Sequence, residues 1–194
     1  MGNREDLIAG AKRCLLEKGY AATTSRDIAA ASGVSLAAIG YHFGSKEALM
    51  NEAVYDSVGE WADELERAMA VGVAPDSARE RFEIAMTRTL KSFDGQGSAL
   101  WGAQLELLGL AQRNEQLRTF LAGVQDFAGR GLAEMFLGID MQADDELSRQ
   151  AGYVMHALFI GLLAKFHLDP AQALSAEELA TGLRAIGDRL AGSQ

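Results

Sequence analysis

The sequence predicts an all-α protein of about nine helices. Apolar residues recur at three- and four-residue steps along most of the 194-residue chain. No segment shows sustained polar–apolar alternation with β-branched residues, so we expect no sheet. Hydrophobic residues make up 48% of the chain, enough to bury a substantial core. We expect a three-helix domain at residues 1–50, called the head here, and a helical domain at 51–194, called the body.

A first helix is expected before Gly19, bracing the two short helices that follow. Its apolar stripe consists of Leu7, Ile8, Ala11, Leu15 and Leu16. The single cysteine, Cys14, falls on this helix, so no intrachain disulfide can form and the chain fits a reducing cytoplasm. We interpret Cys14 as a packing residue.

The second helix is expected to begin at Thr24 and to end at Ser32-Gly33. Thr24 is a favourable N-cap, and Asp27 stands three residues later, so hydroxyl and carboxylate can satisfy the free amides reciprocally. Gly33 can take the left-handed conformation of a sharp turn. Two short helices joined by such a turn form a helix-turn-helix.

The third helix is expected over 36–43, with Ser35 as its cap and Val34 packed into the turn. Ile39 and Phe43 are four residues apart and share its buried face. Gly44 ends this helix, and Ser45 caps a fourth one that carries Lys46 in its first turn and ends before Pro75.

Five further helices follow from the apolar periodicity and from breaks at 95–97 and at Asp169-Pro170. They are expected at 78–93, 99–111, 115–137, 145–167 and 175–191, the last with a capping pattern at Ser175 and Glu178.

The run Gly33-Val34-Ser35 followed by 41–49, YHFGSKEAL, resembles the N-terminal domain of TetR-family transcriptional regulators. The resemblance covers roughly residues 4–50; beyond it, only the length, the helical content and the segment 101–106 are similar. It implies a homodimer that binds a double-stranded DNA operator, and a body that senses a small-molecule effector.

The candidate DNA-binding residues lie on the second and third helices and at the start of the fourth. Hydroxyls at helix N-termini can bind phosphate, although capping alone is the alternative. Arg26 can reach a phosphate or a guanine, or be an ordinary surface residue. Tyr41 and His42 match family positions that contact the DNA backbone, although His42 could instead be a capping side chain, and Lys46 is the best phosphate candidate. The full set is Thr24, Ser25, Arg26, Ser35, Leu36, Ala37, Ala38, Gly40, Tyr41, His42 and Lys46.

The exposed start of the third helix departs from the family pattern. Many relatives carry lysine or threonine where this chain has Leu36, and an aromatic residue where it has Gly40. Few side chains at the start of this helix can therefore form hydrogen bonds with base edges, although Leu36 or Ala37 could contact a thymine methyl. Gly40 costs about 1 kcal/mol of helix propensity against alanine, which indicates either close approach to DNA or tolerance. We expect Arg26 and Tyr41 to carry more specificity than usual.

Charge is distributed unevenly between the two predicted domains. The chain has a net charge of -9, which would repel DNA if it were spread evenly. Residues 1–50 hold six basic and five acidic side chains, a net charge of +1, and the remainder holds 12 and 22, a net charge of -10. The acidity belongs to the body, as expected for a two-domain regulator.

The last two predicted helices have the composition of an interface. Residues 153–166 are nearly all apolar, and the final helix aligns Leu179, Leu183, Ile186 and Leu190 on one face. We expect a homodimer through these helices as a four-helix bundle, as the family resemblance also implies; burial within one chain is the alternative. A dimer would place two third helices about one DNA turn apart, or a multiple of it.

Large side chains of the central helices are candidates for an effector pocket, with core packing as the alternative for each. They are Trp101, Gln104, Leu108, Phe127, Met155 and Phe159. His156 is interpreted as a satisfied core histidine.

Other function classes have little support. The histidines His42, His156 and His167 lack metal-binding spacing, and Cys14 lacks a catalytic partner, so we expect no enzyme, metal or cofactor. The chain has no signal-peptide pattern and no run of about 18 apolar residues, so we expect a cytoplasmic protein without a membrane span. The remaining alternative is a helical interaction module with a degenerate head. We expect repression, because a dimer on an operator can block polymerase unaided; activation stays open.

Overall fold

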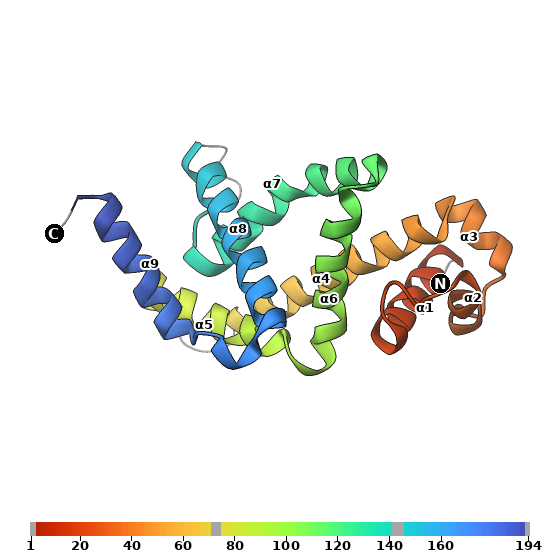
Figure 1. The fold of residues 1–194 in the computed structure, drawn as a ribbon, viewed down its shortest axis with the longest axis horizontal. Coiled ribbons are helices and arrows are strands. Elements are labelled where there is room, and N and C mark those ends of the chain that lie inside the picture. Colours follow the sequence, from red (N-terminus) through yellow and green to blue (C-terminus); the bar gives the residue numbers. More distant parts are fainter. Residues whose placement is uncertain (1–2, 71–74, 141–145, 193–194) are drawn as a thin grey trace. The chain divides into compact units, whose positions relative to one another are not determined.

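The computed structural model describes residues 3–70, 75–140 and 146–192. Within these ranges all regular structure is helical (Figure 1), which confirms the all-α prediction. The elements are α1 (Asn3–Lys18), α2 (Ser25–Ser32), α3 (Leu36–Phe43), α4 (Lys46–Ala70), α5 (Ala78–Ser92), η1 (Gly95–Gly97), α6 (Ser98–Ala111), α7 (Glu115–Leu137), α8 (Glu146–Leu168), η2 (Pro170–Gln172) and α9 (Ala176–Leu190). Asp145, where one helix was expected to begin, lies outside the described residues.

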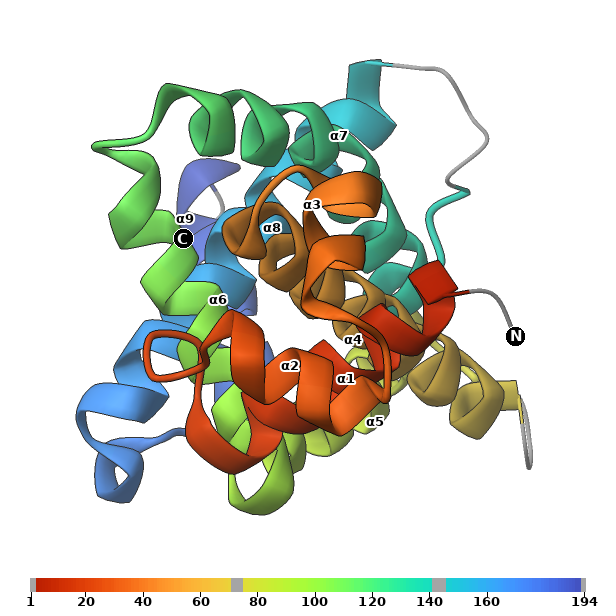
Figure 2. The same ribbon diagram turned by 90° about the vertical axis from the view of Figure 1, so that its right-hand side faces the viewer.

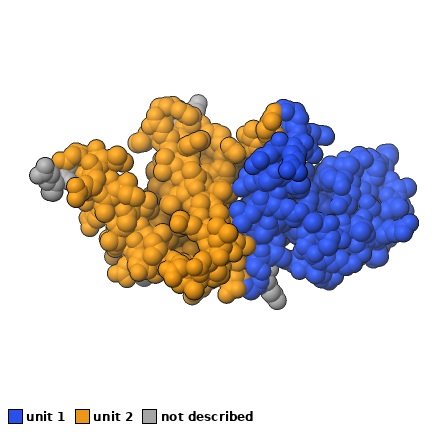
Figure 3. Space-filling model, in the orientation of Figure 1, with its two compact units in different colours: residues 1–64, 95–117 blue, residues 65–94, 118–194 orange. Residues whose placement is uncertain are grey.

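The chain forms two compact units, each discontinuous in sequence (Figure 3). Unit 1 comprises residues 1–64 and 95–117, and unit 2 comprises 65–94 and 118–194. α6 therefore belongs to the same unit as α1, α2 and α3. The predicted boundary between head and body at residue 50 falls within α4 and stays a prediction about function.

In unit 1, α1, α2 and α3 gather at the N-terminal end of α4 (Figures 1 and 2), and α6 contacts α1. Leu7, Ala11 and Leu15 of α1 are fully or almost fully buried, as predicted. Leu16 was wrongly placed on this stripe, because its side chain is 56% exposed. One residue after Leu15, it points about 100° away from the packed face.

Cys14 lies within the core of unit 1. The thiol is free and the residue is almost fully buried. Burial raises its pKa, which keeps the sulfur protonated and unreactive at neutral pH. The interpretation of Cys14 as a packing residue is confirmed.

Unit 2 is organised around aromatic side chains. Phe93 meets Phe159 and Phe166 edge-to-face, at ring-centre distances of 5.7 and 5.6 Å. The ring centres of Phe82 and Phe136 lie 6.1 Å apart. α5 packs against α9, where Nη2 of Arg79 donates to the Thr181 hydroxyl at 3.3 Å. These contacts connect α5 and the residue that follows it with α7, α8 and α9.

α8 carries more exposed apolar surface than a core helix. An 18-residue window within it has a mean hydropathy of 1.4, and 22% of that window is buried. The sequence holds no unbroken run of about 18 apolar residues, because polar residues such as His156 interrupt it, but α8 is by length and average composition a candidate for a membrane span. One such helix is weak evidence for a membrane span. Its apolar surface still requires an explanation.

Candidate DNA-binding site

The start of α2 is fixed by the predicted capping box. Oγ1 of Thr24 accepts from the Asp27 amide at 3.2 Å, and Oδ2 of Asp27 accepts from the Thr24 amide at 2.9 Å. Nζ of Lys18 donates to the other oxygen of Asp27 at 2.5 Å. The bonds with Lys18 and Thr24 hold the pKa of Asp27 well below its usual range. Asp27 is thus occupied within the protein and stays ionised.

The turn between α2 and α3 follows the predicted geometry. Gly33 has φ 72° and ψ 11°, the left-handed region that favours glycine, and its amide donates to the Ala29 carbonyl at 3.0 Å. Oγ of Ser32 accepts from the Val34 amide at 3.2 Å. The turn therefore fixes the direction in which α3 leaves α2.

α3 presents its predicted DNA-facing side to solvent. Ile39 is buried, whereas Leu36, Ala37, Gly40 and Tyr41 are exposed, with Tyr41 at 86%. The other predicted contacts on this helix, Ala38 and His42, are half-buried. The Tyr41 and His42 rings meet edge-to-face with centres 4.9 Å apart. The exposed side offers methyl groups, one phenol and bare backbone, so few groups on it can hydrogen-bond to base edges.

Ser35 occupies the N-cap position of α3 without a hydrogen bond from its side chain to the helix. The expectation that its hydroxyl caps α3 is therefore wrong in detail. The Ser35 backbone is extended, and its carbonyl accepts from the Ala38 amide at 3.0 Å. An exposed hydroxyl beside free helix amides is left available for a phosphate oxygen.

Most basic side chains of residues 3–50 are engaged within the protein. Among the six, Arg26 alone forms neither an ion pair nor a hydrogen bond, and it is exposed on α2. The others pair as follows: Arg4 with Glu52, Lys12 with Asp56 and Glu60, Arg13 with the Ala31 carbonyl, Lys18 with Asp27, and Lys46 with the Thr23 carbonyl and Glu47. Arg26 is therefore the basic side chain of residues 3–50 that no internal contact holds.

Lys46 is less free than its sequence position indicates. Its Nζ donates to the Thr23 carbonyl at 3.1 Å and lies 3.5 Å from Glu47, and the side chain is 22% exposed. An ammonium group has three donors, so contact with a phosphate remains compatible with this position. Ser25, also predicted, lies half-buried in the first turn of α2.

Sequence reasoning missed the ion pairs that connect α1 to α4. Nζ of Lys12 lies 2.8 Å from Oδ2 of Asp56 and 2.5 Å from Oε2 of Glu60. Burial lowers the pKa of Lys12, but the bonds with both carboxylates outweigh that and raise it. The four-residue spacing of Glu52, Asp56 and Glu60 was the available signal, because it places all three on one face of α4.

The predicted pocket residues divide between the two units. Trp101 is buried and Gln104 and Leu108 are half-buried in unit 1; in unit 2, Met155 and Phe159 are buried and Phe127 is 71% exposed. His156 is half-buried, and burial lowers its pKa. That these six residues line one pocket stays a prediction.

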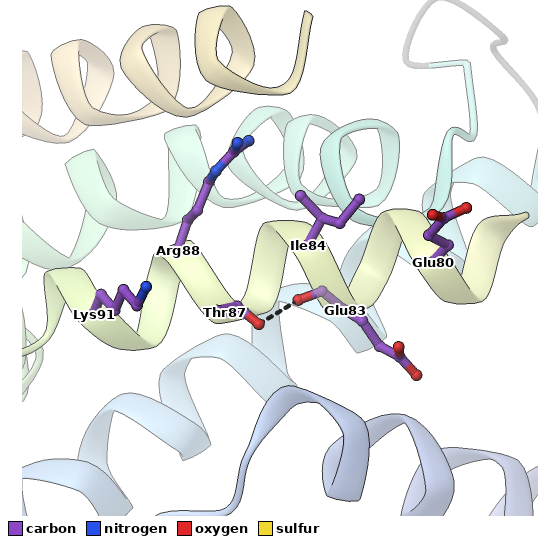
Figure 4. A pocket seen from close by; sticks show the side chains of 6 residues that line it. All are labelled: Glu80, Glu83, Ile84, Thr87, Arg88 and Lys91. Carbon is purple, nitrogen blue, oxygen red and sulfur yellow. Dashed lines mark hydrogen bonds between the residues drawn. The ribbon is translucent and has the colours of Figure 1, made fainter. Parts of the chain in front are cut away.

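A hollow that the sequence did not predict lies along α5. Its volume is about 330 Å³, and it is lined by Glu80, Glu83, Ile84, Thr87, Arg88 and Lys91 (Figure 4). The Thr87 hydroxyl donates to the Glu83 carbonyl at 2.7 Å. Because the lining comes from one helix and is mostly charged, this hollow lacks the apolar enclosure of most small-molecule sites.

Known proteins match both the head and the whole chain. The family described as "Bacterial regulatory proteins, tetR family" matches residues 7–53. The HTH-type transcriptional regulator BetI of Rhizobium meliloti (strain 1021) is 29% identical over 194 residues, which is 95% of this chain and 91% of BetI. The HTH-type transcriptional repressor DhaR of Mycobacterium sp. (strain GP1) is 30% identical over 131 residues, 64% of this chain and 63% of DhaR.

The fold recurs among solved structures. The multidrug binding protein EbrR, complexed with imidazole, superimposes with a TM-score of 0.65 at 22% identity, covering 93% of this chain and 88% of EbrR. Together with the capped α2, the glycine turn and the exposed side of α3, these matches show that the chain belongs to the TetR family of helix-turn-helix transcriptional regulators, which are not enzymes.

Proposed function

We propose that the protein is a dimeric cytoplasmic repressor that leaves a near-palindromic operator when a small molecule binds. The observation that carries the DNA-binding part is the exposed side of α3, next to the exposed and unpaired Arg26 on α2. Backbone amides and the Ser35 hydroxyl would bind phosphate, Tyr41, His42 and Lys46 would flank them, and Arg26 would reach a base or a phosphate. Thr24 and Ser25 would support this contact from the start of α2.

Dimerisation is supported by apolar side chains that unit 2 leaves exposed. Leu147, Tyr153 and Val154 on α8, and Ile186 and Leu190 on α9, are all more than half exposed. Leu179 of α9 is buried and Leu183 half-buried, so the predicted apolar face of α9 divides into a packed first half and an uncovered second half. A second copy covering α8 and α9 would bury the uncovered surface as a four-helix bundle.

Repression and effector release are supported by the relatives. DhaR is named a repressor, and EbrR is a multidrug binding protein with imidazole bound. An effector would weaken operator binding by favouring the conformation with lower DNA affinity. The predicted pocket residues Trp101, Gln104, Leu108, Phe127, Met155 and Phe159 remain candidates for contact with it.

Genomic fragment binding at two salt concentrations tests the proposal. A dimer that neutralises several phosphates should retain specific fragments at low salt and lose affinity steeply as salt rises. Lys46→Ala should weaken binding to all DNA sequences by a similar factor, because a phosphate contact carries no base information. If no fragment is retained at low salt, the interaction module with a degenerate head is correct instead.

A further inference from the structure

The side chain of Arg4, in the first turn of α1, contacts two other helices of unit 1. Its guanidinium lies over the ring of Phe43, the last residue of α3, with the central carbon 5.2 Å from the ring centre. The same guanidinium forms an ion pair with the carboxylate of Glu52 on α4. A planar guanidinium can stack on a ring while its N–H groups bind a carboxylate. Arg4 therefore joins the beginning of α1 to the end of α3 and to α4.

Aromatic contacts continue from Phe43 to the predicted DNA-facing residues of α3. The ring centres of His42 and Phe43 lie 6.3 Å apart, and those of Tyr41 and His42 lie 4.9 Å apart. Among the described residues, Tyr41 has no other ring contact and its hydroxyl forms no hydrogen bond. The positions of both rings therefore depend in part on the ring that Arg4 covers.

The end of α3 has few other supports. α3 has eight residues, fewer than an isolated helix needs to be stable in water, so contacts with other helices must hold it. Its start is fixed by the turn at Gly33, and Ile39 is its one buried residue. Phe43 is half-buried, and the helix ends directly after it. The contact between Arg4 and Phe43 thus supports the part of α3 that the turn does not reach.

The ion pair between Arg4 and Glu52 is too exposed to contribute much to stability. The two side chains are 51% and 37% exposed, and an ion pair in contact with water adds little to the free energy of unfolding. Its consequence is geometric, because Glu52 holds the guanidinium where it meets Phe43. Removing either partner should leave the fold intact and loosen the end of α3.

We propose that Arg4 is a positioning residue for DNA binding: held by Glu52, it orients Phe43 and, through the adjoining rings, the side chains of His42 and Tyr41. This inference rests on the proposed function, in which Tyr41 and His42 flank the bound phosphates. Arg4 itself makes no contact with DNA in this arrangement, so its loss acts through those two residues.

Two substitutions in the full-length protein distinguish positioning from direct contact with DNA. Arg4→Met removes the guanidinium, and Glu52→Gln removes its partner while making the net charge one unit more positive. An arginine that met phosphate itself would bind DNA more tightly once released from Glu52. We expect the opposite for a genomic fragment that the unaltered protein retains: about 5-fold weaker binding by Arg4→Met and about 3-fold weaker binding by Glu52→Gln.

Salt dependence provides a second distinction. The slope of log affinity against log salt should be the same for Arg4→Met as for the unaltered protein, whereas Lys46→Ala, which removes a proposed phosphate contact, should lower it by about one. In protein that also carries Tyr41→Ala and His42→Ala, Arg4→Met should weaken binding by less than about 2-fold, because the side chains that it positions are gone. General destabilisation would weaken binding equally in both backgrounds.

The matched control is Arg113→Met, which removes an exposed arginine of unit 1 whose side chain has no partner within the protein. It should bind DNA as the unaltered protein does. Three results would overturn the inference: unchanged or tighter binding by Glu52→Gln, a slope lowered by about one in Arg4→Met, or an equal effect of Arg4→Met when Tyr41 and His42 are alanine.

Proton NMR of the protein without DNA separates this inference from the proposed function. The imidazole Cε1–H signal of His42, identified by its loss in His42→Ala, should shift in Arg4→Met and in Glu52→Gln, because the ring beside it changes orientation. It should stay in place in Arg113→Met. Protein that retains no DNA but shows these shifts contradicts the repressor proposal and leaves the positioning role intact. Protein that retains DNA with an unshifted His42 signal contradicts the positioning role alone.

Discussion

The head and the α8–α9 surface of unit 2 differ in which side chains they leave free. In the head, five of six basic side chains are engaged internally, and α3 exposes mostly small or neutral residues. On α8 and α9, large apolar side chains remain exposed instead. Shape and backbone should therefore contribute much of DNA docking, whereas apolar burial should drive self-association. Three substitutions probe this difference, in order of decreasing effect.

Leu190→Asp on α9 should have the largest effect. Leu190 is 84% exposed, so the charge costs little in a single chain but would be buried without a partner in the proposed dimer. We expect dimerisation to weaken by about 3 kcal/mol, or about 100-fold. Sedimentation equilibrium measures this, and affinity for a palindromic operator should fall with it.

The matched control is Ala185→Asp, which places the same charge at an exposed position of α9 away from the Leu179–Leu190 face. It should leave the dimer intact. If Leu190→Asp remains as dimeric as Ala185→Asp, the exposed apolar surface of α9 has another purpose.

Arg26→Ala should have an intermediate effect on sequence discrimination. As the unpaired cation of α2, Arg26 can give its guanidinium to a base without breaking an internal contact. We expect the ratio of operator to random-DNA affinity to drop by about 10-fold, the range of one bidentate base contact. Competition binding measures the ratio. Arg184→Ala, an exposed arginine of α9, is the control, and an unchanged ratio in Arg26→Ala would assign specificity elsewhere.

Gly40→Ala should have the smallest effect and resolves an ambiguity of α3. A β-carbon at Gly40 would meet nothing within 4 Å in the free protein. Thermal unfolding should therefore show a gain of about 1 kcal/mol from helix propensity. Gly123→Ala on α7, equally unobstructed, should give a similar gain and unchanged DNA affinity. Weaker DNA binding by Gly40→Ala alone would show close backbone approach to DNA, and unchanged binding would show tolerance.

Local patterns predicted the frame of the head well. The cap of Thr24 and Asp27 and the left-handed Gly33 depend on residues within a few positions of each other, and the structure confirms both. Leu16, by contrast, is apolar like a core residue, but its position on α1 directs its side chain away from the packed face. The spacing of apolar residues predicts that a helix is present more reliably than it predicts which residues lie at the edges of its buried face.

Contacts between residues far apart in the chain could not be predicted from the sequence. The Lys46 ammonium turns to the Thr23 carbonyl, and Lys12 meets carboxylates more than forty residues away. Such pairs depend on how helices cross, which the spacing along one helix does not determine. The assignment of free and engaged cations, on which the DNA-binding proposal depends, therefore required the structure.

The discontinuity of unit 1 limits how this regulator could be recombined with its relatives. A hybrid joining residues 1–50 to another protein's body would replace α6, which contacts α1, and the carboxylates of α4 that hold Arg4 and Lys12. The residues that read the operator would then be transferred without the α4 and α6 side chains that hold α1 in place. A working exchange should carry residues 1–64 together with 95–117, so the portable module is defined by contacts rather than by one continuous stretch of sequence.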